Sequence, residues 1–267
     1  MRVGFTIILN GLQHLEHGKF IETMINAMDY WVIVEGLALP NGSTAWCKRL
    51  DNERKYVSDT GGSVDGTSEL LMDIWAEYPN VEYIAPDAPW HSKDDMVNAA
   101  IDRLNKLVSG YPCMLWQVDC DEQWTLKSME DAEDGLIQAG GTCGCFHADY
   151  FVGHNLVARG TWGEGNDPAD AMRNAYRRLW LWNGKKFATH EPPMLEGGNG
   201  KEVLLPQRFS HYAYYFEEDV AFKERFYGYN GLRKKWLSLQ KMSMPQPISS
   251  LLSNGWASTD TIITRIS

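Results

Sequence analysis

The feature that most constrains the fold of this chain is an alternation of apolar runs and helical patterns in its first half. Short β-rich runs bounded by turn signals predict buried strands. These runs are Val3 to Leu9, Tyr30 to Val34, Val81 to Ile84 and Met114 to Val118. Between them, apolar residues recur at helical spacing in His17 to Met28, in a segment that runs from Thr67 to a stop at Pro79, and in Asp94 to Val108. A βαβαβαβ chain builds a largely parallel sheet with helices on both faces.

In such a sheet, ligands bind outside the carboxyl ends of the strands. Polar residues stand at that position in this sequence: Asn10, Glu35 and Asp119 each directly follow a predicted strand. We therefore expect these three side chains to lie at one edge of the sheet, where a ligand site is expected.

The pattern changes after residue 140, where glycines interrupt the chain. Cys145 to Val157 is predicted as strand, and Ala169 to Trp182 as a helix or a strand pair. The last residues are rich in Ser and Thr and read as a poorly specified tail. We predict a single α/β domain over residues 1–241, with a first half at 1–125, a second half at 126–241, and a tail at 242–267.

Composition excludes several classes of protein. The formal net charge of -10 argues against a duplex nucleic acid partner, because phosphate binding needs a basic surface. The five cysteines include no CxxC pair, which argues against a zinc cluster or a disulfide framework and favours a reducing compartment. No window reaches the apolar length of a membrane span, and the first apolar run is too short for a secretory signal. We expect a cytoplasmic protein.

The segment that follows the fourth predicted strand is strongly acidic. Asp119 and Asp121 are two residues apart, which puts both side chains on one face of an extended backbone. Two such carboxylates can share Mn²⁺ or Mg²⁺, and either cation keeps open positions for substrate phosphates. Glu122 is expected to support these ligands. Asp-x-Asp alone is also common in solvated turns, so the position after a buried strand decides in favour of a cation site.

This combination resembles the GT-A fold of nucleotide-diphospho-sugar glycosyltransferases, in particular family 2-like members with a DxD motif. The segments Val32-Ile33-Val34-Glu35-Gly36 and Ser63-Val64-Asp65-Gly66-Thr67 resemble the two halves of a nucleotide-binding stretch, here split by residues 37–62. The resemblance implies a metal-dependent transfer of a sugar from a nucleoside-diphosphate-sugar to an acceptor hydroxyl. The donor is expected to be a UDP-sugar before a GDP-sugar, and the acceptor a glycan, a lipid-linked molecule or a protein.

The resemblance also implies roles for individual residues. The nucleotide-sugar would be bound by Asn10, Glu35, Asp65, Lys93 and Asn98. His211 would join Asp119 and Asp121 on the metal. In an inverting enzyme, Glu191 would be the base, with His190 beside it and with Asp149 and Glu164 in reserve.

Each of these roles has a structural alternative. Asp65 also suits a helix start, Lys93 a surface position, His190 and Glu191 a hydrogen-bonded pair, and His211 an aromatic core. Three other functions compete with the transferase: a sugar-nucleotidyltransferase, a glycoside hydrolase with two carboxylates, and a non-enzymatic carbohydrate-binding protein. The first of these normally has a glycine-rich basic loop after the first strand, which Asn10-Gly11-Leu12-Gln13-His14 does not match. A basic stretch from Lys223 to Lys241 is read as a solvated face, with an anionic acceptor or a membrane surface as the alternative.

Overall fold

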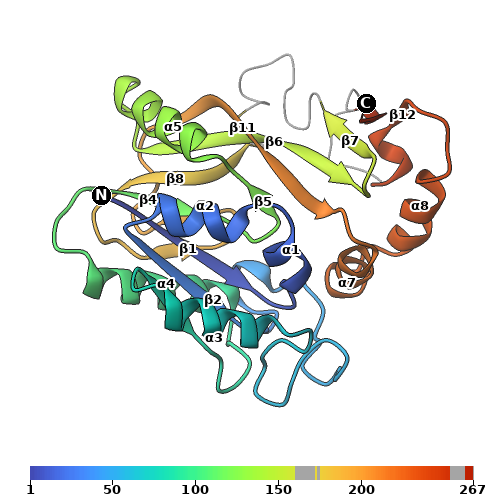
Figure 1. Ribbon diagram of the computed structural model, residues 1–267, viewed down its shortest axis with the longest axis horizontal. Helices are drawn as coiled ribbons and strands as arrows, with labels where there is room; N and C mark the ends of the chain where they lie inside the picture. The colour runs from blue at the N-terminus through green and yellow to red at the C-terminus, as the bar shows by residue number, and fades with distance from the viewer. Residues whose placement is uncertain (160–171, 173–174, 253–261, 267) are drawn as a thin grey trace. The chain divides into compact units, whose positions relative to one another are not determined.

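A computed structural model describes residues 1–159, 172, 175–252 and 262–266 (Figure 1). The chain divides into two compact units that alternate along the sequence. Unit 1 comprises Met1–Gly144 and Arg177–Val203, and unit 2 comprises Cys145–Tyr176 and Leu204–Ser267. These boundaries do not coincide with the predicted divisions after residues 125 and 241, because the chain leaves unit 1 at residue 144 and returns to it at residue 177.

Unit 1 is built on a sheet whose strands run in the order β8-β4-β1-β2-β3. The central strand β1 pairs in parallel with β2, from Val3 opposite Tyr30 to Ile8 opposite Glu35, and in parallel with β4 on its other side. β3 extends the parallel part, and β8 closes it in antiparallel orientation. The bounds are β1 Arg2–Ile8, β2 Tyr30–Glu35, β3 Val81–Ile84, β4 Cys113–Gln117 and β8 Tyr176–Trp182.

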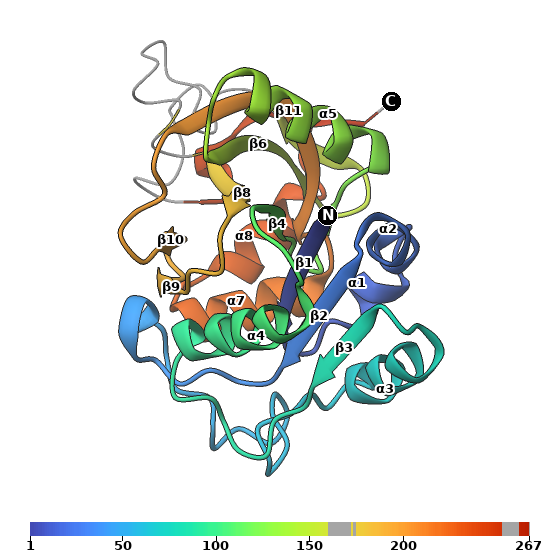
Figure 2. The ribbon, with the colours of Figure 1, turned by 90° about the vertical axis from the view of Figure 1, so that its left-hand side faces the viewer.

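Helices cover both faces of this sheet, with α4 on one side and α2 and α3 on the other (Figure 2). Two helices of unit 1, α4 and α5, begin at residues whose side chains cap them. The Ser92 hydroxyl accepts a hydrogen bond from the Asp95 N–H at the start of α4, and Thr125 and Ser128 form a capping box at α5. The helices of unit 1 are α1 Leu12–Glu16, α2 Phe20–Ala27, α3 Thr67–Glu77, α4 Lys93–Leu107 and α5 Leu126–Gln138. Shorter elements are η1 Gly42–Thr44, β5 Glu122–Gln123, β9 Phe187–Thr189 and β10 Met194–Leu195.

The core of unit 1 lies between the helices and the central strands. Phe5, Trp31 and Trp116 are fully buried in it. The buried Thr6 hydroxyl is paired within this core: it donates to the Val118 carbonyl at 2.7 Å and accepts from the Trp31 indole N–H at 3.0 Å. The predicted α/β class with a mostly parallel sheet and flanking helices is therefore confirmed.

Unit 2 consists of antiparallel strands and two helices. β7 pairs with β6 and with β13, and β13 pairs with β12. The bounds are β6 Cys143–Val152, β7 Leu156–Arg159, β11 Glu202–Tyr214, β12 Gln246–Pro247, β13 Ile262–Arg265, η2 Ile248–Ser250, α7 Glu217–Tyr227 and α8 Leu232–Leu239. The segment expected to be a poorly specified tail thus contributes β12, β13 and the buried Ile263. Among the described residues, no helix is long and apolar enough to cross a membrane.

Candidate active site

Asn10 lies just after β1 and Glu35 is the last residue of the neighbouring β2, and both bind the segment that leads into α3. Asn10 has a left-handed backbone, with φ of 51°. Its side-chain oxygen accepts from the Val64 N–H at 2.9 Å, its amide donates to the Tyr56 carbonyl at 2.7 Å, and its N–H donates to the Ser63 hydroxyl at 2.9 Å. Residues 37–62 therefore return to the end of β1, and Asn10 fixes that return.

The Glu35 carboxylate is fully buried and is surrounded by donors from the protein. One oxygen accepts from the Ser63 N–H at 2.8 Å and the Ser68 hydroxyl at 2.7 Å, and the other accepts from the Tyr83 hydroxyl. Burial and the neighbouring Glu35 raise the pKa of Tyr83. In this structure Glu35 holds β2, β3 and α3 together, and its contact with a nucleotide stays a prediction.

Asp65 has the geometry of a helix-start residue. One carboxylate oxygen accepts from the Thr67 N–H at 3.1 Å and the Thr67 hydroxyl at 2.6 Å, and the other accepts from the Leu12 N–H at 3.1 Å. The side chain stabilises the first turn of α3 and ties it to α1. This is the structural alternative named for Asp65, and its role in nucleotide binding stays a prediction.

Asp119, two residues after the end of β4, is held by a buried arginine. Arg178 on β8 donates from Nη2 to Asp119 Oδ2 at 2.9 Å. The same guanidinium binds Glu122 with contacts of 2.6, 2.9 and 3.1 Å, and the Glu122 side chain is 0% exposed. A bidentate guanidinium fixes both the position and the orientation of a carboxylate. Glu122 therefore supports Asp119 through Arg178.

The second oxygen of Asp119 is a candidate cation ligand. Asp119 Oδ1 is buried and has no hydrogen-bond partner among the described residues. A buried carboxylate oxygen without a donor is unfavourable, and a cation would compensate it. No group of three or more His, Cys, Asp or Glu side chains in the described part of the chain is arranged to hold a metal ion. That Asp119 and Asp121 hold a cation, with its other ligands from a substrate and water, stays a prediction.

Lys93 and Asn98 lie on α4, and this helix packs against β9. The Asn98 amide donates to the Phe187 carbonyl and its oxygen accepts from the Phe187 N–H, both at 2.9 Å. Both polar groups of Asn98 are thus engaged with the backbone of β9, which leads into His190 and Glu191. Asn98 positions this segment, and its contact with a nucleotide-sugar stays a prediction.

The backbone at His190 and Glu191 is anchored by Asp94 and Ser43. The Asp94 carboxylate accepts from the His190 N–H at 2.6 Å, the Ser43 N–H at 2.8 Å and the Ser43 hydroxyl at 2.5 Å. The Ser43 oxygen in turn accepts from the Glu191 N–H at 3.1 Å. Burial acts to raise the pKa of Asp94, but the hydrogen bonds from Ser43 and His190 outweigh it and lower that pKa. Residues 37–62 contain η1, and through Ser43 they hold the backbone of Glu191, the candidate base.

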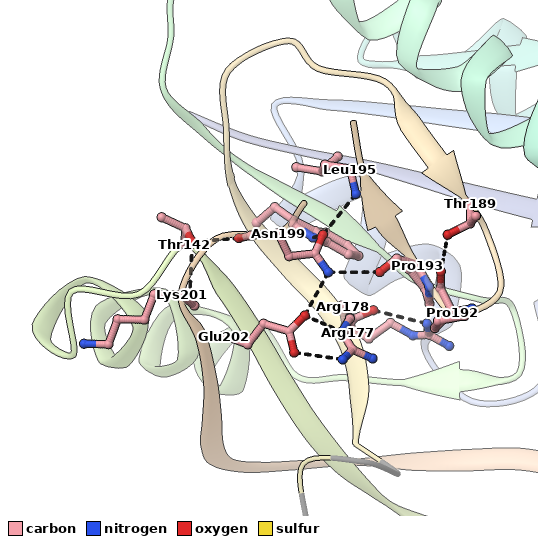
Figure 3. Close-up of polar contacts among 11 residues, drawn as sticks. Thr142, Arg177, Arg178, Thr189, Pro192, Pro193, Leu195, Asn199, Lys201 and Glu202 are labelled. Carbon is pink, nitrogen blue, oxygen red and sulfur yellow. Dashed lines mark hydrogen bonds and ion pairs between the residues drawn. The ribbon is translucent and has the colours of Figure 1, made fainter. Parts of the chain in front are cut away.

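Downstream of Glu191, the side chain of Asn199 holds the backbone at Pro193 and Leu195 (Figure 3). Its amide donates to the Pro193 carbonyl at 3.1 Å and to the Glu202 carboxylate at 2.9 Å. Its oxygen accepts from the Leu195 N–H at 3.0 Å and the Trp180 indole N–H at 3.1 Å. All the hydrogen-bonding capacity of this amide is used, so the backbone of residues 190–193 is held from both ends.

Burial and charge set the protonation of His190 and Glu191. Burial, with a smaller contribution from the Lys93 charge, lowers the pKa of His190 to about 3, so this imidazole is neutral at pH 7. Glu191 is exposed on one side but closely surrounded by protein, and this desolvation raises the pKa of its carboxyl group. The charges of Lys93 and Arg178 lower that pKa, and the charge of Asp119 raises it. The structure thus brings Lys93, Asp119, Arg178, His190 and Glu191 within electrostatic range of one another.

Two other candidates, His211 and Asp149, belong to unit 2. His211 is buried in unit 2 against the rings of Tyr150, Tyr176 and Phe209, with centroids 4.8, 5.6 and 5.8 Å away. Its role as a metal ligand stays a prediction. Asp149, also in unit 2, pairs with Arg208 at 2.9 Å, and Glu164 lies outside the described residues.

Comparison of the fold with solved structures shows what this architecture resembles. Residues 1–349 of S. aureus TarS match with a TM-score of 0.51 at 10% identity, over 83% of this chain and 63% of that chain. A longer TarS structure matches with a TM-score of 0.42 at 11% identity, over 89% of this chain and 42% of that one. The chain thus spans less than two thirds of the length of these structures. No protein-family model matches the sequence, and no curated protein matches it. The match to TarS 1–349 confirms the GT-A-like fold.

Proposed function

We propose that this protein is a glycosyltransferase that moves a sugar from a nucleoside-diphosphate-sugar to an acceptor hydroxyl. The observation that carries the proposal is that two different carboxylates, Asp119 after β4 and Glu191 after β9, lie within electrostatic range of each other. Asp119 has a buried oxygen with no hydrogen-bond partner among the described residues, and Glu191 has a raised pKa and a rigid backbone. A cation ligand and a proton acceptor are the two groups that sugar transfer from a diphosphate requires.

The fold supports the class of donor. TarS, whose residues 1–349 share this fold, is a GT-A-type nucleotide-sugar glycosyltransferase. The same part of TarS has been crystallised with UDP-GlcNAc. We therefore assign a UDP-sugar as the first donor to test. The acceptor classes, a glycan, a lipid-linked molecule or a protein, and the cytoplasmic location remain as the sequence predicts them.

Each side chain has a defined task in an inverting transfer. Glu191 takes the proton from the acceptor hydroxyl, whose oxygen bonds to the anomeric carbon while the bond from that carbon to the diphosphate oxygen breaks. Lys93 offsets the negative charge of the departing nucleoside diphosphate. Asp119 and Asp121 would hold Mn²⁺ or Mg²⁺, which supplies positive charge for that leaving group. His190 stays neutral and packs beside the base.

The base is tested with Glu191→Gln, a change that removes the proton acceptor and keeps the shape of the side chain. We expect sugar transfer from a UDP-sugar to fall roughly 10²- to 10⁴-fold. Donor binding, followed as a rise in melting temperature, should be unchanged. The matched control is Glu196→Gln, an exposed glutamate just after β10, which should retain full transfer. Full transfer by Glu191→Gln would show that Glu191 is not the base.

The cation site is tested with Asp121→Asn in a panel of UDP- and GDP-sugars with and without Mn²⁺. The parent should be stabilised by one donor in a Mn²⁺-dependent way, and the variant should lose that dependence. An unchanged Mn²⁺-dependent stabilisation would remove Asp121 from the site. Glycan binding with no donor binding by the parent would favour the carbohydrate-binding alternative.

A further inference from the structure

Unit 2 contains a cavity of about 250 Å³ that the proposed transfer does not use. It lies between the end of β11, the loop that joins α7 to α8, α8 itself and the residues after η2. Its lining includes Tyr214, Tyr229, Asn230, Leu232, Lys235 and Leu251. It is smaller than the roughly 300–1,000 Å³ typical of sites for drug-sized ligands, so its ligand is closer to one sugar ring than to a nucleotide.

The loop at the mouth of this cavity is held in place by the protein itself. Glu224 accepts from the Gly231 N–H at 3.1 Å and from the Arg233 N–H at 2.8 Å. Gly228 and Gly231 have left-handed backbones, with φ of 73° and 77°. The shape of the loop therefore depends on glycine and on Glu224, and the cavity is formed without a ligand.

The lining of the cavity has an apolar floor and a basic rim. Leu232, Leu251 and Tyr214 are buried, whereas Lys235 is half-buried and Asn230 is exposed. Lys235 has no ion-pair partner among the residues that the structure describes, whereas Arg233 on the same helix pairs with Glu217. No carboxylate is among the described residues that line the cavity. On a chain with a net charge of -10, an amine without a counter-charge at a cavity mouth indicates an anionic ligand.

The other side chains that line the cavity indicate the chemical group to which the anion is attached. Tyrosine presents a rigid apolar face with a polar edge, which suits a sugar ring. The Asn230 amide has donors and an acceptor for hydroxyl groups, and a lysine amine binds phosphate as a point charge. We propose that this cavity binds a hexose phosphate, with the phosphate on Lys235 and the ring against the tyrosine and leucine side chains. The ligand is either a free phosphomonoester or a phosphodiester-linked unit of a glycan.

The test is calorimetric titration of the full chain with glucose 6-phosphate. The parent should bind it saturably, and Lys235→Met should weaken the binding about tenfold or more, because a charged hydrogen bond is lost. The matched control is Lys234→Met, which removes an exposed lysine of α8 that is not among the lining residues and should bind as the parent does. A second variant, Asn230→Asp, puts a carboxylate at the exposed mouth and should also weaken binding.

Further titrations separate the possible outcomes. Glucose and inorganic phosphate should each bind more weakly than glucose 6-phosphate, and equal binding of inorganic phosphate would overturn the sugar assignment. Absence of binding to the parent, or equal binding by Lys235→Met, would overturn the site. The methyl phosphodiester of glucose 6-phosphate distinguishes the sources, since tighter binding of the diester assigns a glycan. Asp121→Asn should leave all these affinities unchanged, so the result is independent of the transferase proposal.

Discussion

Replacing Arg178 by Met tests how unit 1 holds its acidic cluster. The substitution leaves Glu122, 0% exposed, without the guanidinium that contacts it at 2.6, 2.9 and 3.1 Å. It also removes the donor to Asp119 Oδ2 at 2.9 Å. Removal of one partner of a buried ion pair costs about 3–5 kcal/mol, because the other charge stays buried and uncompensated. At roughly 2–4 °C per kcal/mol for a chain of this size class, the melting temperature should fall by about 6–20 °C.

The assay is urea unfolding of the parent, Arg178→Met, Glu122→Gln and the double variant. The double variant removes both charges, so it should be more stable than Arg178→Met alone, and the cycle should give a coupling of roughly 1–3 kcal/mol. The matched control is Arg177→Met. Arg177 pairs with Glu202, and the two side chains are 21% and 24% exposed. This loss should be about 1 kcal/mol. A loss below about 1 kcal/mol for Arg178→Met, or no recovery in the double variant, would refute the reasoning.

Three further predictions concern the segment around Glu191. Lys93→Met removes a positive charge that lowers the pKa of Glu191, so the acid limb of the transfer rate should move to higher pH; a pH–rate profile that is unchanged or moves to lower pH would contradict this. Asn98→Ala removes both hydrogen bonds to Phe187 and should cost about 1–3 kcal/mol in urea unfolding; Asn98→Asp should not recover this loss, because a carboxylate oxygen would then face the Phe187 carbonyl. His190 has a pKa of about 3 in the folded protein, against an ordinary value of 6.5, so the unfolded chain binds more protons between these values. Stability should therefore fall on acidification by up to about 1.4 kcal/mol per pH unit, and His190→Gln should lessen that slope when ΔG of unfolding is measured between pH 6 and 4.

The strands and helices of the first half follow from local sequence because each is a short apolar pattern that fits one period. Val3 to Leu9 and Met114 to Val118 predicted strands that the structure places at Arg2–Ile8 and Cys113–Gln117. The beginning of the third helix at Thr67 was also predicted. The pattern of Ala169 to Trp182 is compatible with a helix or with a strand pair, and the structure forms β8 from Tyr176 to Trp182.

The sequence alone determined which residues follow buried strands, because the apolar runs that make those strands also mark their ends. Asn10, Glu35 and Asp119 were found in this way. Only the tertiary structure decided what these residues contact. Arg178 lies 59 residues from Asp119, and Asp94 lies 51 residues from Ser43 and 96 from His190. No local period encodes such pairs. They exist because the antiparallel return of β8 beside β4 and the packing of η1 and β9 against α4 bring distant segments together, and burial then makes their hydrogen bonds necessary.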